Sequence, residues 1–137
     1  MENTMAEHMS PRTRFLAAVL GERVDRPPVG TVTSLANTEA MDLCGASFPE
    51  AHGAPELMAN LAAFVSLEAG FDMMFPVYSV VHEAAAVGAE VDWGRKDVMP
   101  MVREPLWSEP EEIAIPADFE ERPAMKVVTE ALRRLRE

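Results

Sequence analysis

Residues 70–94, GFDMMFPVYSVVHEAAAVGAEVDWG, decide how this chain is organised. An amphipathic helix runs into this stretch and ends at Gly70, a residue type that commonly terminates helices. A short apolar strand is predicted at 72–77, and a second short strand at 89–93. Polar side chains lie between the two strands. A helix that leads into an apolar strand with polar groups at its carboxyl end is typical of an α/β protein, which builds its active site at that edge.

Helix and strand signals continue on both sides of this stretch. Proline or a capping side chain at the start and glycine at the end predict helices, at 11–20, 39–44, 55–69 and from Pro123 onward. A strand rich in β-branched residues is predicted at 29–33, and an irregular or edge strand at 98–102. Because strands alternate with helices, we expect parallel βαβ units with right-handed crossovers.

The composition favours one soluble domain. The chain has 137 residues, of which 48% are hydrophobic, enough for one packed core. Its formal net charge of -11 excludes a surface for nucleic acid or anionic membranes, because phosphates would be repelled. We expect residues 1–9 to be a flexible tail and 10–137 to be the domain. No apolar run approaches the ~20 residues of a membrane span.

A single cysteine, Cys44, favours a reducing cytoplasm, since it cannot form an internal disulfide. It is interpreted as a small buried residue, with a catalytic nucleophile as the alternative. No metal-ligand spacing is present, so no metal site is predicted. His52, in a loop, is either a ligand contact or, as we prefer, a surface histidine.

Candidate site residues gather where the predicted strands end. Glu83, beside His82, could act as a general acid or base or hold a substrate cation. The alternative is that both are solvated groups on the first turn of a short helix. Thr31, Thr33 and Ser34 could hydrogen-bond a ligand, or they could simply be strand and turn residues.

Five segments, in this order, resemble the uroporphyrinogen decarboxylase superfamily, and more closely its branch of corrinoid-dependent methylcobamide:coenzyme M methyltransferases. They are SPRTRFLAA at 10–18, DRPPV at 25–29, TEAM at 38–41, FPEAH at 48–52 and EAAAVGAEVDWG at 83–94. The resemblance covers nearly the whole chain from Ser10 and implies the N-terminal part of a (β/α)₈ barrel, with about two to three βα units. A whole barrel needs ~250 residues, so the chain is expected to be a fragment or a split subunit.

The methyltransferase branch implies transfer of a methyl group from methylcobalamin on a corrinoid protein to a thiol that zinc activates. In that branch zinc is held by a His-x-Cys pair and a later Cys. This chain has no His-x-Cys, and Cys44 matches no zinc ligand, so zinc is expected to come from sequence outside it. The expected catalytic residue is Glu83, with Thr33, Tyr78 and His82 lining the substrate pocket.

The sequence also leaves other interpretations of the chain open. The expected partners are a corrinoid protein or the C-terminal half of the barrel, and a homo-oligomer is possible. A non-catalytic half-barrel that acts as an interaction module is the alternative to an enzyme. Porphyrinogen decarboxylation is the third interpretation. It is disfavoured because Glu83 stands about where the decarboxylase aspartate would be, and because Thr31–Leu35 replaces an arginine-rich loop.

Overall fold

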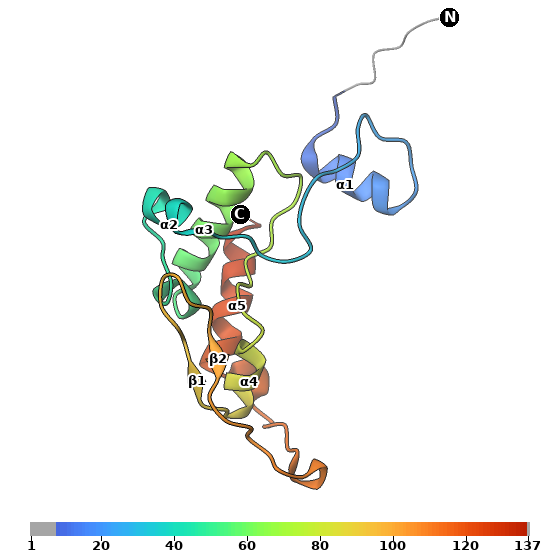
Figure 1. Cartoon of the computed structure of the whole chain (residues 1–137). Coiled ribbons are helices and arrows are strands. Elements are labelled where there is room, and N and C mark those ends of the chain that lie inside the picture. Colours follow the sequence, from blue (N-terminus) through green and yellow to red (C-terminus); the bar gives the residue numbers. More distant parts are fainter. Residues whose placement is uncertain (1–7, 137) are drawn as a thin grey trace, which may run out of the picture.

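The computed structural model describes residues 8–136, which form a mainly helical body with two projecting parts (Figure 1). In the described residues the regular elements are α1 (Pro11–Val19), α2 (Thr38–Cys44), η1 (Glu50–His52), α3 (Pro55–Glu68), α4 (His82–Val87), β1 (Val91–Asp92), β2 (Met101–Val102), η2 (Pro110–Glu112), η3 (Phe119–Glu121) and α5 (Pro123–Arg134). Residues 1–7 of the predicted tail lie outside the described part.

The helices begin where the sequence predicts, within one residue. The Ser10 hydroxyl accepts a hydrogen bond from the Thr13 amide at 3.1 Å at the start of α1. The Asn37 side chain accepts one from the Ala40 amide at 2.8 Å at the start of α2. Each bond satisfies an amide that the helix itself leaves unpaired. α2 ends at Gly45, whose φ of 69° suits glycine.

The core lies around α3, against which α2 and α5 pack (Figure 1). Met58 and Leu61 of α3 are fully buried, as is Ala131 of α5. The small Ala131 lets the two helices approach closely. Met58 and Leu61 lie on the buried face of the amphipathic helix that the sequence predicts before Gly70.

The predicted parallel sheet does not form in residues 8–136. The one ladder there is antiparallel and pairs Val91 with Val102 and Asp92 with Met101. The strand predicted at 89–93 is thus shortened to β1, and the edge strand predicted at 98–102 is shortened to β2. Residues 29–31 and 73–77 run without a ladder, turn or bend, and the backbone bends at Val32, Thr33 and Asp72. A strand needs a bonded neighbour along its length, and these segments lack one, so the count of two to three βα units is not confirmed.

The two extended segments nevertheless lie side by side and run in the same direction. The Asp72 amide donates to the Val29 carbonyl at 2.7 Å, where both segments begin. One residue further, a Cβ on Gly30 would lie 2.1 Å from Cγ of Met73, so only glycine allows this approach without moving the methionine. The order expected of two parallel strands is therefore present with this one backbone hydrogen bond and no ladder.

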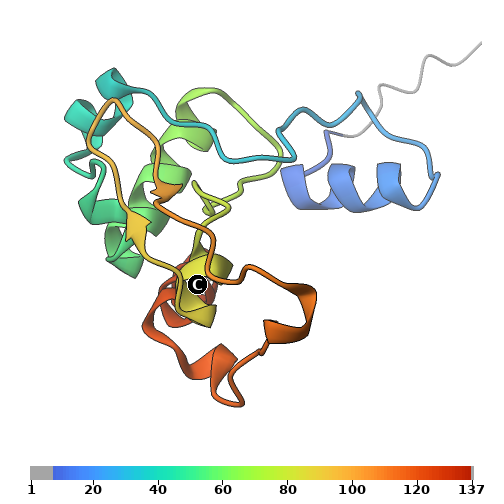
Figure 2. The ribbon, with the colours of Figure 1, turned by 60° about the horizontal axis from the view of Figure 1, so that its bottom comes forward.

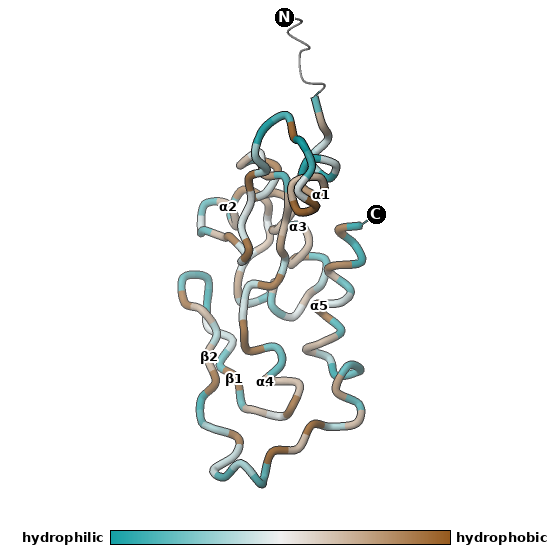
Figure 3. Tube along the Cα trace, turned by 90° about the vertical axis from the view of Figure 1, so that its right-hand side faces the viewer, coloured by the Kyte–Doolittle hydropathy of each residue, from teal (hydrophilic) through white to brown (hydrophobic). Residues whose placement is uncertain are grey.

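Two parts project from the body (Figure 2). One is α1, at the blue end of the chain. The other is the loop between β2 and α5, along which hydrophilic and hydrophobic stretches alternate (Figure 3) and in which Ile113 and Ile115 are exposed. No helix within the described residues is long and apolar enough to cross a membrane.

Candidate functional site

A hollow of about 680 Å³ lies where the two extended segments end. Thr33 and Ser34 line it from the first segment. Residues 75–80 line it from the second, apart from the buried Pro76, and Glu83 lines it from the first turn of α4. Met99 and Pro100 close it from the chain that leads into β2. Three of the four predicted site residues, Thr33, Tyr78 and Glu83, are therefore brought together here.

Glu83 is exposed at the edge of the hollow, and within residues 8–136 no hydrogen bond or ion pair engages its carboxylate. The residue is solvated and it also faces the hollow, so its role as a general acid or base stays a prediction. A free carboxylate in this position can accept a proton or hold a cation. It is the one carboxylate that the described residues place on the hollow's lining.

Thr33 is held by a local turn rather than by a strand ladder. The Thr31 hydroxyl donates to the Thr33 carbonyl at 2.7 Å and accepts from the Thr33 amide at 3.1 Å. Short turns of this kind are common for threonine. The turn fixes Thr33 at the rim of the hollow.

Tyr78 lines the hollow, but its hydroxyl is enclosed. The residue is 4% exposed, its oxygen has no hydrogen-bond partner in the described part of the chain, and its ring meets Phe48 edge-on at 5.3 Å. Burial raises the pKa of the phenol well above its usual range, with a smaller contribution from nearby Cys44. The phenol therefore stays neutral, and a ligand in the hollow would meet other atoms of Tyr78.

His82 does not line the hollow. It is 1% exposed, with Nδ1 3.3 Å from the Ser79 carbonyl and Nε2 3.1 Å from the His52 carbonyl. The ring thus bridges the start of α4 to η1. This is neither the ligand contact nor the solvated residue that the sequence suggested.

His52 is buried as well, so the surface histidine preferred from the sequence is wrong. It is 1% exposed and stacks on Phe48 at 4.2 Å, and neither ring nitrogen has a partner among the described residues. Burial, together with a smaller Coulombic effect from His82, lowers the pKa of His52 to about 4. Phe48 and Trp93, whose rings lie 4.2 and 6.0 Å from the ring of His52, form an apolar wall that favours the neutral form of His52.

A cluster of four charged residues at the other end of the extended segments escaped the sequence analysis. Nη1 of Arg14 donates to Oδ1 of Asp72 at 2.5 Å, and its Nε donates to Oδ1 of Asp25 at 2.6 Å. Arg26 donates to both oxygens of Asp72, at 2.6 and 3.0 Å. The Asp72 carboxylate also accepts from the Val29 amide at 2.8 Å. We call these four side chains the ion-pair cluster.

The ion-pair cluster holds the fold together and offers no charge to a substrate. The hydrogen bonds from Arg26 and Val29 hold the pKa of Asp72 at about 2, although burial opposes them. Hydrogen bonds from Arg14 likewise hold the pKa of Asp25 below its usual range. All four charges are mutually compensated, so the cluster leaves none for a substrate. An aspartate at the start of an apolar strand was the one sequence signal that could have pointed to it.

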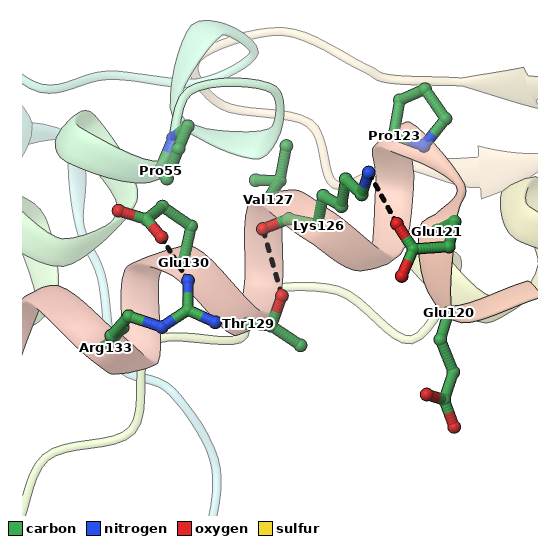
Figure 4. A pocket seen from close by; sticks show the side chains of 9 residues that line it. All are labelled: Pro55, Glu120, Glu121, Pro123, Lys126, Val127, Thr129, Glu130 and Arg133. Atoms are coloured by element: carbon green, nitrogen blue, oxygen red, sulfur yellow. Dashed lines mark hydrogen bonds and ion pairs between the residues drawn. The ribbon is translucent and has the colours of Figure 1, made fainter.

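A second hollow, about 860 Å³, runs along α5 beside Pro55 (Figure 4). Its charged groups pair with one another: Lys126 with Glu121 at 2.7 Å, and Arg133 with Glu130 at 2.5 Å. Glu120 points away from both pairs (Figure 4). With its cations already neutralised, this groove is a weaker candidate than the hollow at Glu83.

The residues present do not fit a zinc ion. Nowhere in residues 8–136 do three His, Cys, Asp or Glu side chains gather as ligands. The Cys44 thiol faces the carbonyl oxygens of Met41 and Ala46, at 3.9 and 3.8 Å. Both buried histidines are enclosed by aromatic rings and carbonyls. A tetrahedral thiolate and imidazole set is therefore not available here.

The model of one family, uroporphyrinogen decarboxylase (URO-D), matches residues 10–137. The chain belongs to the URO-D family. The methylated-thiol–coenzyme M methyltransferase of Methanosarcina mazei is 37% identical over 132 residues, which are 96% of this chain and 36% of that protein. The methylcobamide:CoM methyltransferase MtaA of Methanosarcina barkeri is 38% identical over 92% of this chain and 38% of its own length.

A solved methyltransferase from Methanosarcina mazei superposes on this URO-D-family chain with a TM-score of 0.85 and 39% identity. The match covers 93% of this chain and 38% of that structure. The chain therefore spans less than two fifths of the relatives that it resembles. This chain and the solved relative agree both in sequence and in the arrangement of their elements. The family resemblance seen in the sequence is therefore confirmed.

Proposed function

We propose that this chain forms part of a methyltransferase that moves a methyl group from a methylated corrinoid protein to a thiol. The observation that carries the proposal is the hollow at Glu83, which lies in a chain similar to methylcobamide:CoM methyltransferases over nine tenths of its length. Decarboxylation of a porphyrinogen is not proposed, because the relatives described above are methyltransferases.

Glu83 is the proposed catalytic residue. In the transfer, the thiol loses its proton and its sulfur forms a bond to the methyl carbon as the bond from that carbon to cobalt breaks. A free carboxylate at the rim can accept the thiol proton or orient a cationic group. Thr33 and the backbone around Tyr78 would position the thiol substrate. In this proposal His82 does not touch a ligand, because its ring is buried and does not line the hollow.

In this proposal the ligands of zinc lie outside the described residues, because the described residues do not fit the ion. No step is assigned to a metal here. The cytoplasmic setting and the corrinoid partner are likewise proposals that rest on family membership.

An interaction module is the second candidate function. The observation that favours it is the unladdered pair of extended segments, whose backbone is free to pair with another polypeptide. In that case the chain would bind a partner without turning over methylcobalamin.

The test uses a chimera in which this full chain replaces the matched segment of the Methanosarcina mazei methylated-thiol–coenzyme M methyltransferase. The chimera is incubated with zinc, methylcobalamin and a thiol, and the change in corrin absorbance is followed. We expect turnover by the chimera. A folded chimera without turnover, under conditions where the parent relative is active, would contradict the methyltransferase proposal and favour the interaction module.

A further inference from the structure

We propose that His82 is a positioning residue, whose buried ring ties the turn that carries Glu83 to η1 and so fixes the Glu83 carboxylate at the rim of the hollow. This inference rests on the proposed function, in which Glu83 is the catalytic residue. The first observation is the geometry of the ring. Nε2 of His82 lies 3.1 Å from the His52 carbonyl, and Nδ1 lies 3.3 Å from the carbonyl of Ser79, which lines the hollow. One ring therefore joins η1, the wall of the hollow and the first turn of α4.

The second observation is how little else holds that turn. α4 has six residues, and no side chain caps its N-terminus. A helix this short is marginal on its own, because few hydrogen bonds offset the cost of starting it. Its two buried residues are His82 and Ala86, each 1% exposed and four positions apart on one face. Since Ala86 offers only a methyl group, His82 supplies the directional contacts.

The direction of Glu83 follows from the burial of its neighbour. Successive side chains of a helix are turned by roughly 100° about its axis. With His82 held inside, Glu83 is therefore turned away from the body, and it is exposed at the hollow. If the ring were released, α4 could rotate and carry the carboxylate away from the rim.

The acceptor at the far end of the tether belongs to the core. His52 is 1% exposed and its ring stacks on Phe48 at 4.2 Å. On another side the ring of Trp93 meets His82 edge-on at 5.3 Å. We assign the N–H of His82 to Nε2, because that contact is the shorter of the two and spans 30 positions of the chain.

Methyl transfer by the chimera tests this role through three variants of His82, with rates expressed per folded protein. His82→Phe keeps a ring of similar size and removes both polar contacts, so kcat should fall at least about tenfold. His82→Gln places an amide nitrogen about where Nε2 lies and should keep most of the natural kcat. His82→Asn reaches only about as far as Nδ1 and should lose about as much as His82→Phe. Equal kcat for the Gln and Asn variants overturns the proposal.

A double-mutant cycle with Glu83→Gln separates positioning from packing. In the Glu83→Gln background, His82→Phe should lower kcat by less than about twofold, because the group that it positions is already gone. The same fold-loss in both backgrounds would show a merely structural role and overturns the proposal. Leu61→Ala is the control, since it removes a fully buried side chain from α3 and should lower Tm without changing kcat.

Hydrogen exchange of this chain alone reads the tether without turnover. In His82→Phe the amides of Ala85, Gly88 and Ala89, which hydrogen-bond within and just after α4, should exchange at least about tenfold faster, while those of α3 stay protected. Unchanged exchange in α4 overturns the proposal.

Two further outcomes are covered by the same experiments. If His82→Phe does not fold, His82→Asn takes its place in the cycle and in the exchange measurement. A folded chimera without turnover would refute the proposed chemistry, and the exchange of α4 then decides by itself whether His82 holds the turn of Glu83.

Discussion

Arg14 and Asp72 form an ion pair across 58 positions of the chain, with Nη1 and Oδ1 2.5 Å apart and both side chains 1% exposed. Asp72 also binds Arg26 and the Val29 amide. This one carboxylate therefore joins the α1 region to the segment that leads to the hollow. It sets the starting point from which Thr33 and residues 75–80 reach the same cavity.

Replacing Asp72 with alanine should therefore destabilise the chain strongly. The change leaves the Arg14 guanidinium buried beside Asp25 alone and removes the acceptor for Val29. Removal of one partner from a buried pair costs far more than loss of an exposed one. The matched control is Asp97→Ala, which removes an exposed pair with Arg95. We expect the fall in Tm to be several times larger for Asp72→Ala, and similar values would contradict the role of the ion-pair cluster.

Acid should weaken the same cluster between roughly pH 4 and pH 2. The pKa of Asp72 in the folded chain, about 2, lies below the ordinary value of an aspartate. Its contribution is therefore complete above about pH 4 and is lost as the pH falls through the folded pKa. Denaturant titrations at pH 5, 4 and 3 measure this, with Asp72→Asn as the comparison. The variant should lose less stability over this interval than the natural chain.

His52 should make the chain sensitive to milder acid. Its pKa of about 4 in the folded chain is below the ordinary value, so the unfolded chain binds the proton more readily. Stability should fall as the pH drops from about 6.5 towards 4. His52→Phe keeps an aromatic ring against Phe48 and removes the titration. If the variant loses as much unfolding free energy as the natural chain between pH 6.5 and 4.5, the buried neutral histidine is the wrong account.

Gly30→Val should destabilise by about 1–3 kcal/mol, the usual cost of forcing atoms into a filled space. A Cβ at this position meets the Met73 side chain. The double variant with Met73→Ala should recover much of the loss, because the space is then free. Denaturant unfolding of the two single variants and the double variant gives the coupling directly. Additive losses would show that the two segments do not touch as described.

Leu61→Ala should cost about 2–5 kcal/mol of unfolding free energy, since Leu61 is fully buried in the centre of the core. Leu67→Ala, on the same helix but 71% exposed, should change it by less than about 0.5 kcal/mol. Chemical denaturation of both variants measures the difference. A small effect at Leu61 would place the core elsewhere.

The sequence predicts the helices of this chain well, because their signals are local. Ser10, Asn37 and Gly45 act within one turn of the helix ends that they define. The strands were predicted less well, because an extended segment becomes a strand only when a neighbour supplies its hydrogen bonds. At 29–33 and 72–77 that neighbour is absent from residues 8–136.

Only part of the candidate site could be predicted, because some of its contacts join residues that are far apart in the sequence. Thr33 and Glu83 meet at the hollow because parallel segments end at one edge, a rule that can be applied to sequence. The inward turn of His82 depends on the His52 carbonyl, 30 positions away, and the ion-pair cluster depends on a contact over 58 positions. No local pattern reports contacts at that separation.

The measurement that tests the central claim most directly is the methyl-transfer rate of the chimera with Glu83→Gln against Glu56→Gln. Both glutamates are exposed in the first turn of a helix, but only Glu83 lines the hollow. We predict that kcat/KM falls at least about tenfold for Glu83→Gln, as expected for loss of a general acid or base, and stays unchanged for Glu56→Gln. Equal rates in the two variants would contradict the assignment of this hollow as the methyltransferase site.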